Sequence, residues 1–172
     1  MRVSLAPAIL LFAAAAPAVV WAQKVDIEFD EAARFPDYKT FMIRDGQLNA
    51  KAPALQGDLV RKKIENQIRK SLTAKGLTEV TSQPDLNVFY TLGAGRRNEV
   101  ETYPAGWRGL ARRRVQVQYT EGTLILNLRD ASRRELVWRA IAVEEKRTPV
   151  QVEDRLDEMV KKSIDKYPPR KK

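Results

Sequence analysis

Residues 119–145 read YTEGTLILNLRDASRRELVWRAIAVEE, and this stretch decides the fold. Apolar residues occupy every second position on both sides of a short polar break. These positions are Leu124, Leu126, Leu128, Leu136, Trp138, Ala140 and Ala142. Such alternation around a polar break is typical of a β-hairpin with one buried face. The sequence therefore predicts a hairpin that places Leu126 and Trp138 in the core.

Shorter alternating runs predict further strands on the same sheet. We expect strands at residues 25–29, 38–44 and 86–91, and a run from residue 115 that leads into the hairpin. Apolar residues on both faces of 86–91 indicate a central strand. Residues 49–57 are polar and contain proline, which predicts a loop. The alternation changes phase at Gly122, where we expect a β-bulge or bend.

Two amphipathic helices are predicted by apolar residues at helical spacing. The first begins near Leu59 and ends at Gly76, and the second begins after Thr148 with the pattern of a capping box. Their apolar stripes are Leu59, Val60, Ile64, Ile68 and Leu72, and Val152, Leu156, Met159, Val160, Ile164 and Tyr167. The expected fold is an α+β two-layer sandwich, a mostly antiparallel sheet of about five or six strands with both helices on one face.

Residues 1–22 have the pattern of a cleaved secretory signal peptide, with Arg2, an apolar run and small residues before Gln23. A retained membrane anchor is the alternative, but a spanning helix needs about 20 apolar residues, and this run is shorter. We expect residues 23–172 to form one domain without a transmembrane segment. The chain has no Cys, so neither disulfides nor a lipid anchor at the cleavage site is expected. The predicted location is the periplasm of a Gram-negative bacterium, as a soluble protein.

The charge is strongly positive, with 31 Lys and Arg against 22 Asp and Glu. Such an excess favours anionic partners, although its role can also be solubility alone. For an exported protein these partners are lipid head groups, lipopolysaccharide or another envelope protein rather than nucleic acid.

The sequence contains few residues of the types that usually carry out catalysis. There is no His and no Cys, so the usual general base and the usual zinc ligands are missing. We predict no catalytic residue, no metal site and no cofactor. Carboxylates that a glycosidase would need occur on the first strand and at the end of the hairpin, where the alternative is a charged sheet edge. They are Asp26, Glu28, Asp30, Glu31, Glu144 and Glu145.

One unusual patch is RRNEVETYPAGWRGLARRR at residues 96–114. Arginine interleaved with aromatic residues can bind phosphate and stack on rings. We expect a loop here, with a candidate anion- or ligand-binding surface; a solvated hairpin end is the alternative. The candidate residues are Arg96, Arg97, Tyr103, Trp107, Arg108, Arg112, Arg113 and Arg114.

Four segments together carry a family resemblance. They are FPDYKTF at 35–41, KGL at 75–77 with PDLNVFY at 84–90, EGTLILNLRD at 121–130 with LVWR at 136–139, and YPP at 167–169. In this order they resemble the family called domain of unknown function 4136 (DUF4136), small exported bacterial envelope proteins that are often lipoproteins. The resemblance implies an α+β envelope domain and implies no activity. This chain departs from the family in lacking the lipobox Cys and in having an Arg-rich loop where relatives often have Gly and aromatic residues.

These observations leave three functional hypotheses. The leading one is a non-enzymatic binding or envelope-associated module with a basic Arg-rich loop. The second is a structural partner subunit whose sheet edge or loop docks on another envelope protein. The third is a carboxylate-dependent hydrolase.

Overall fold

β6 (Ala111–Asp130) and β7 (Leu136–Arg147) form the predicted hairpin, in a computed structural model of the chain. The structure describes residues 24–50, 53–105 and 111–170, and for residues 95–105 and 111–121 it describes the backbone. The expected signal peptide, residues 1–22, lies outside the described residues. Trp107 and Arg108 lie outside them as well.

The buried face of the hairpin is the one predicted from the alternation. Leu126 and Trp138 are at most 1% exposed, so both are core residues as expected. The pairing of β6 with β7 shifts register beside Gly122, where a bulge or bend was predicted. A Cβ atom on Gly122 would lie 2.5 Å from Val152 of the C-terminal helix. The glycine therefore allows that helix to approach the sheet closely.

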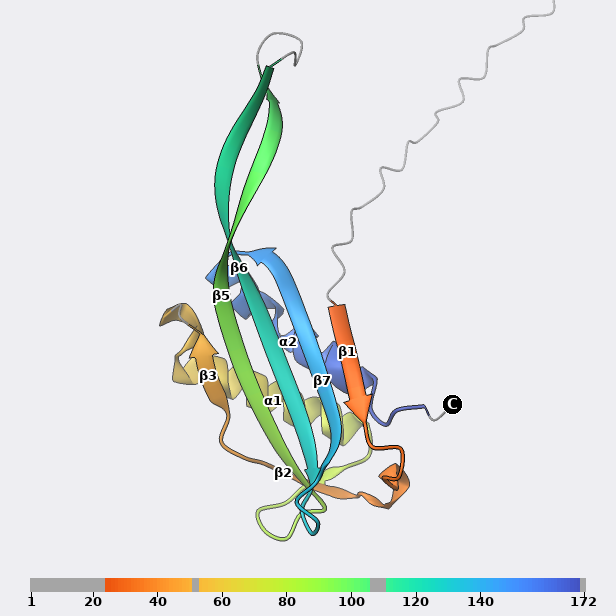
Figure 1. Ribbon diagram of the computed structural model, residues 1–172. Helices are drawn as coiled ribbons and strands as arrows, with labels where there is room; N and C mark the ends of the chain where they lie inside the picture. The colour runs from red at the N-terminus through yellow and green to blue at the C-terminus, as the bar shows by residue number, and fades with distance from the viewer. Residues whose placement is uncertain (1–23, 51–52, 106–110, 171–172) are drawn as a thin grey trace, which may run out of the picture.

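In the described residues, seven strands form one open mixed sheet in the order β1-β7-β6-β5-β2-β4, with β3 beside β5 (Figure 1). The remaining strands are β1 Lys24–Phe29, β2 Thr40–Ile43, β3 Gln47–Ala50, β4 Thr78–Glu79 and β5 Leu86–Ala105. β1, β7, β6 and β5 pair antiparallel in turn, whereas β2 and β3 run parallel to β5 and β4 runs parallel to β2. The α+β class is confirmed, and β5 is central as predicted. The predicted loop at 49–57 is wrong at its start, because β3 includes Asn49 and Ala50.

Helices α1 (Asp58–Ala74) and α2 (Pro149–Asp165) cover one face of the sheet (Figure 1). The predicted capping box is present: the Gln151 N–H donates to Thr148 Oγ1, and the Thr148 N–H donates to Gln151 Oε1. Gly76 has φ +89° and ends α1 as expected. The predicted stripe of α1 is wrong at Leu59, which is 78% exposed, because it is turned about 100° around the helix from the buried Val60 and lies outside the packed face.

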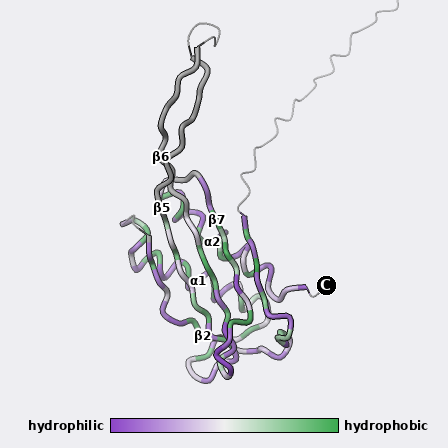
Figure 2. The backbone as a smooth tube through the Cα atoms, in the orientation of Figure 1, coloured by the Kyte–Doolittle hydropathy of each residue, from purple (hydrophilic) through white to green (hydrophobic). Residues whose placement is uncertain are grey.

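The core lies between the helix layer and the sheet. Figure 2 shows hydrophobic residues recurring along the strands of the body. Buried residues from both helices meet the inner faces of β5, β6 and β7; among them are Ile64, Ile68, Leu92, Leu124 and Leu156. In the part of the chain that the structure describes, no helix is long and apolar enough to cross a membrane.

Candidate functional site

β5 and β6 continue as a two-stranded ribbon beyond the rest of the sheet (Figure 1). β3 pairs with β5 only as far as Ala94, and β7 pairs with β6 only as far as Thr120. Nine further pairs, from Arg97↔Tyr119 to Ala105↔Ala111, join β5 and β6 without a third strand among the described residues. A strand rises about 3.3 Å per residue, so this part extends on the order of 25–30 Å. We refer to residues 95–105 and 111–121 as the ribbon.

The expected Arg-rich loop is therefore mostly strand. Arg96, Arg97 and Tyr103 lie in β5, and Arg112, Arg113 and Arg114 lie in β6. The register sets three of these arginines opposite three consecutive residues of β5; the pairs are Thr102↔Arg114, Tyr103↔Arg113 and Pro104↔Arg112. Sequence reasoning ended the strand too early because Gly93 and Gly95 weaken a local strand pattern. Pairing with β6 carries the strand through both glycines.

The ribbon and its connection carry a net positive charge. Residues 95–121 contain six arginines and three glutamates, an excess of three positive charges. Five of the six arginines lie in the described strands, and Arg108 lies at the connection outside the described residues. The ribbon thus brings the candidate arginines of both strands into a single element.

A buried carboxylate, Asp130, holds the opposite end of the hairpin. It is 7% exposed and accepts hydrogen bonds from the Tyr38 hydroxyl (3.0 Å), the Ser132 hydroxyl (2.7 Å) and the Arg133 Nε (3.2 Å). The backbone N–H groups of Ser132 and Arg133 also donate to it, at 2.9 Å each. Burial alone would raise the pKa of Asp130, but these donors hold it well below its usual range. The carboxylate is therefore ionised and fixes the turn.

A second carboxylate, Asp85, ties β2 to β5 nearby. It accepts hydrogen bonds from the backbone N–H groups of Lys39 (2.9 Å) and Thr40 (2.8 Å) and from the Thr40 hydroxyl (2.8 Å). The backbone bond from Lys39 is the largest cause of a lowered pKa for Asp85. Together, Asp85 and Asp130 fix the backbone of Lys39 and the ring of Tyr38.

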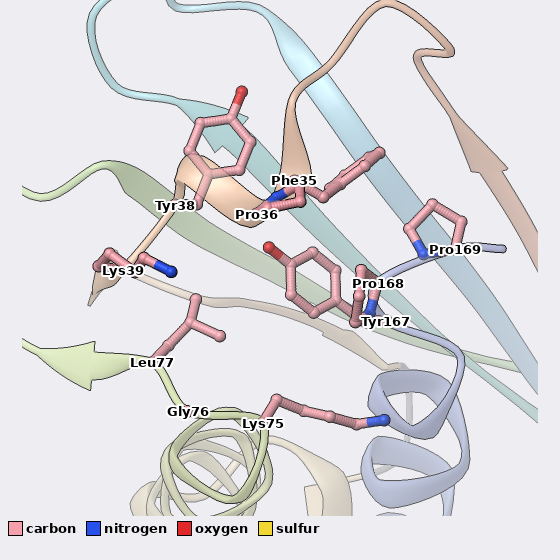
Figure 3. A pocket seen from close by; sticks show the side chains of 10 residues that line it. All are labelled: Phe35, Pro36, Tyr38, Lys39, Lys75, Gly76, Leu77, Tyr167, Pro168 and Pro169. Atoms are coloured by element: carbon pink, nitrogen blue, oxygen red, sulfur yellow. The ribbon is translucent and has the colours of Figure 1, made fainter. Parts of the chain in front are cut away.

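A pocket of about 380 Å³ opens beside these anchors (Figure 3). Three segments that are distant in the sequence line it: residues 35–39, residues 75–77 and residues 167–169. Sequence reasoning placed Tyr167 on the apolar stripe of α2 and did not find the pocket. Its only signal was that these three segments are among those quoted for the family resemblance.

Three of the carboxylates considered for hydrolysis, Asp26, Glu28 and Glu144, lie beside cations in the described structure. Asp26 lies 3.0 Å from Lys24, and Glu28 lies 3.6 Å from Arg139. Glu144 is buried on the helix side, 3.8 Å from Arg155. Within the described residues, no group of Asp and Glu has the arrangement of a metal site.

Comparison with protein-family models matches residues 25–169 to the model described as "Domain of unknown function (DUF4136)". Among solved structures, a DUF4136 family protein from Bacteroides thetaiotaomicron is similar at 17% identity and TM-score 0.57, covering 85% of this chain and 96% of that chain. The PelC dodecamer from Paraburkholderia phytofirmans is similar at 12% identity and TM-score 0.51, covering 87% of this chain and 100% of that chain.

A PDZ domain protein from Parabacteroides distasonis is similar at 16% identity and TM-score 0.62, covering 86% of this chain. The chain spans 36% of the length of that protein. At these identities the likeness shows the fold. The comparison with curated proteins gave no match.

Proposed function

The chain belongs to the DUF4136 family, and on that premise we propose that it is a non-enzymatic binding module of the cell envelope whose contact element is the ribbon. The observation that carries this proposal is the run of nine strand pairs that extends past β3 and β7. The description of the family model names no function.

Physical chemistry supports a contact role for such a ribbon. A two-stranded hairpin is marginally stable in water on its own. Contact with a surface removes apolar and backbone groups of the ribbon from water and so stabilises it. The six arginines of residues 95–121 favour a phosphate-bearing surface, because guanidinium groups form paired hydrogen bonds with phosphate oxygens. The proposed partner is an anionic envelope surface made of lipid head groups or lipopolysaccharide.

Replacing Arg112, Arg113 and Arg114 together by Ser tests the proposed contact. Each basic residue near an anionic membrane contributes about 1 kcal/mol, so three contribute about 3 kcal/mol, or more than 100-fold in affinity. We expect this loss in a vesicle co-sedimentation assay with phosphatidylglycerol at low salt. Arg112, Arg113 and Arg114 lie beyond the residues of β5 and β6 that pair with β3 and β7, so the pairing of the rest of the described sheet is unchanged and the melting temperature should not fall.

The matched control replaces Arg170, Lys171 and Lys172 by Ser, which also removes three positive charges. This variant should keep its affinity if the ribbon is the contact element. Equal loss in both triple variants would show that net charge alone causes the adsorption. Added salt should weaken binding of the unmodified protein, because the screening length is about 8 Å at 0.15 M.

Export is a further part of the proposal. We expect protein recovered from the periplasmic fraction to begin at Gln23, because residues 1–22 have the pattern of a signal peptide. N-terminal sequencing of that fraction measures this directly. Recovery of the chain with Met1 intact, in the membrane pellet, would contradict it.

A self-assembling subunit is the second candidate function. The similar structure of PelC is described as a dodecamer. In the part of the chain that the structure describes, β1 pairs with β7 on one side and has no strand on the other. An open strand edge can pair with a second chain. A molar mass from light scattering that exceeds one chain would support assembly.

A further inference from the structure

The pocket beside Tyr38 has an unusual hydroxyl in its wall. Tyr167 is only 3% exposed, and its hydroxyl has no hydrogen-bond partner in the described structure. Figure 3 shows this hydroxyl directed into the space between Pro36 and Leu77. A buried hydroxyl without a partner is uncommon, because it gives up its hydrogen bond to water without a replacement. The pocket wall therefore contains a buried hydroxyl that has no hydrogen-bond partner among the described residues.

The Tyr167 ring is held firmly in place. Its centroid lies 5.7 Å from that of Phe35 and 5.8 Å from that of Trp138, both in edge-on contacts. Burial raises the pKa of Tyr167 well above its ordinary value. The hydroxyl consequently keeps its proton at neutral pH and can donate a hydrogen bond.

The rim of the pocket is positively charged. Among the described residues, the ten that line the pocket include Lys39 and Lys75 and no carboxylate. The Lys75 ammonium donates to the Asp165 carbonyl oxygen at 2.9 Å and turns toward α2. The Lys39 ammonium is directed into the same space as the Tyr167 hydroxyl (Figure 3), and Asp85 holds the Lys39 backbone in place. An anionic group would thus meet a cation and a hydroxyl donor together.

The other walls are apolar and rigid. They are formed by the rings of Phe35, Pro36, Pro168 and Pro169 and by the side chain of Leu77. Tyr38 contributes the face of its ring, because its hydroxyl points away and donates to Asp130. A volume of about 380 Å³ is in the range of small-molecule sites. These walls suit a short acyl chain or a single ring.

We propose that this pocket binds a small amphipathic anion, with its apolar part between Phe35 and Leu77 and its anionic head at Lys39 and the Tyr167 hydroxyl. The shared chemistry is an anionic head on a short apolar chain, and the head can be a carboxylate or a phosphate monoester. This site is separate from the ribbon, at the other end of the sheet, and does not depend on its role.

Octanoate, octyl phosphate and octan-1-ol are suitable probes, since they share a chain and differ in the head. Titration of the ¹⁵N-labelled mature chain should shift the backbone amide signals of Gly76 and Leu77 with either anion. Octan-1-ol should bind at least tenfold more weakly, because it lacks the charge that meets Lys39. Binding of only one anion supports the proposal and identifies the head group.

Three variants locate the binding. Lys39→Gln should weaken binding of the anion at least fivefold, and Tyr167→Phe should weaken it at least threefold while the melting temperature is kept, since the ring stays in place. Lys62→Gln, an exposed position of α1, should leave binding unchanged. The proposal is overturned if neither anion shifts Gly76 and Leu77 at 10 mM, if octan-1-ol binds equally well, or if Lys39→Gln and Tyr167→Phe both bind like the unmodified protein.

Discussion

Replacing Trp138 by alanine is expected to lower the free energy of unfolding by about 3–5 kcal/mol, the usual range for truncating a buried large aromatic residue. Trp138 is 0% exposed, stands opposite Phe29 of β1 and Leu128 of β6, and contacts the Tyr167 ring. The change therefore leaves a cavity where β1, β7 and the end of α2 meet. Total stabilities are roughly 5–15 kcal/mol, so urea unfolding should show the loss clearly.

Trp138→Phe is the matched control for that experiment. The indole Nε1 has no hydrogen-bond partner in the described structure, so phenylalanine loses volume but no hydrogen bond. Its cost should be about 1–2 kcal/mol. If Trp138→Ala left the unfolding curve unchanged, the Trp would be exposed and the sheet would be packed on its other face.

Replacing Asp130 by asparagine is expected to destabilise the protein by about 3 kcal/mol at pH 7, since hydrogen bonds to charged groups contribute about 1.5–3 kcal/mol and five donors converge here. The donors come from Tyr38, Ser132 and Arg133. Asparagine places an N–H₂ group against one or more of them. Urea unfolding at pH 7 measures the difference, and Asp154→Asn, an exposed position on α2, should cost little.

The cost of Asp130→Asn should depend on pH with a definite sign. The pKa of Asp130 is lower in the folded protein, so its stabilisation is complete above the unfolded pKa of about 3.9 and is lost as pH falls below that value. Between pH 7 and pH 3 the difference between the two proteins should shrink by about 1 kcal/mol, because one pKa unit corresponds to about 1.4 kcal/mol. An equal difference at both pH values would show that Asp130 is not held ionised by its donors.

Local sequence pattern predicted the elements that bury a single face. Alternation identified the hairpin and the inward direction of Trp138, and Thr148 with Gln151 marked the start of α2. These features depend on neighbours two to four residues apart. A regular stripe of apolar residues two to four positions apart constrains which face of a strand or helix is buried, and the structure buries that face.

Features that depend on pairing with distant strands were missed. β3 has four residues and becomes a strand only through its parallel pairing with residues 91–94 of β5. The ribbon continues through Gly93 and Gly95 because β6 supplies a partner at every position. Leu59 was counted in the apolar stripe of α1, but it is turned about 100° around the helix from the buried Val60 and lies outside the face that packs.

The candidate site was predictable only in part. The sequence shows the concentration of arginine at residues 96–114. It did not predict that these residues form the long two-stranded ribbon. The pocket has no continuous signature, because it joins Phe35, Leu77 and Tyr167 from three segments. Tyr167 was expected to be a core residue, and it is; the direction of its hydroxyl depends on the way α2 meets the segment before β2.

The most direct test of the central claim removes the ribbon. Ala94 and Gly122 are paired across β5 and β6, so residues 95–121 can be replaced by Asn-Gly, which favours a two-residue hairpin turn. The shortened chain should melt near the temperature of the full mature chain and lose co-sedimentation with phosphatidylglycerol vesicles. The triple variant of Arg170, Lys171 and Lys172, which loses the same net charge, should still bind. A shortened chain that folds and binds these vesicles as well as the full chain would contradict the account.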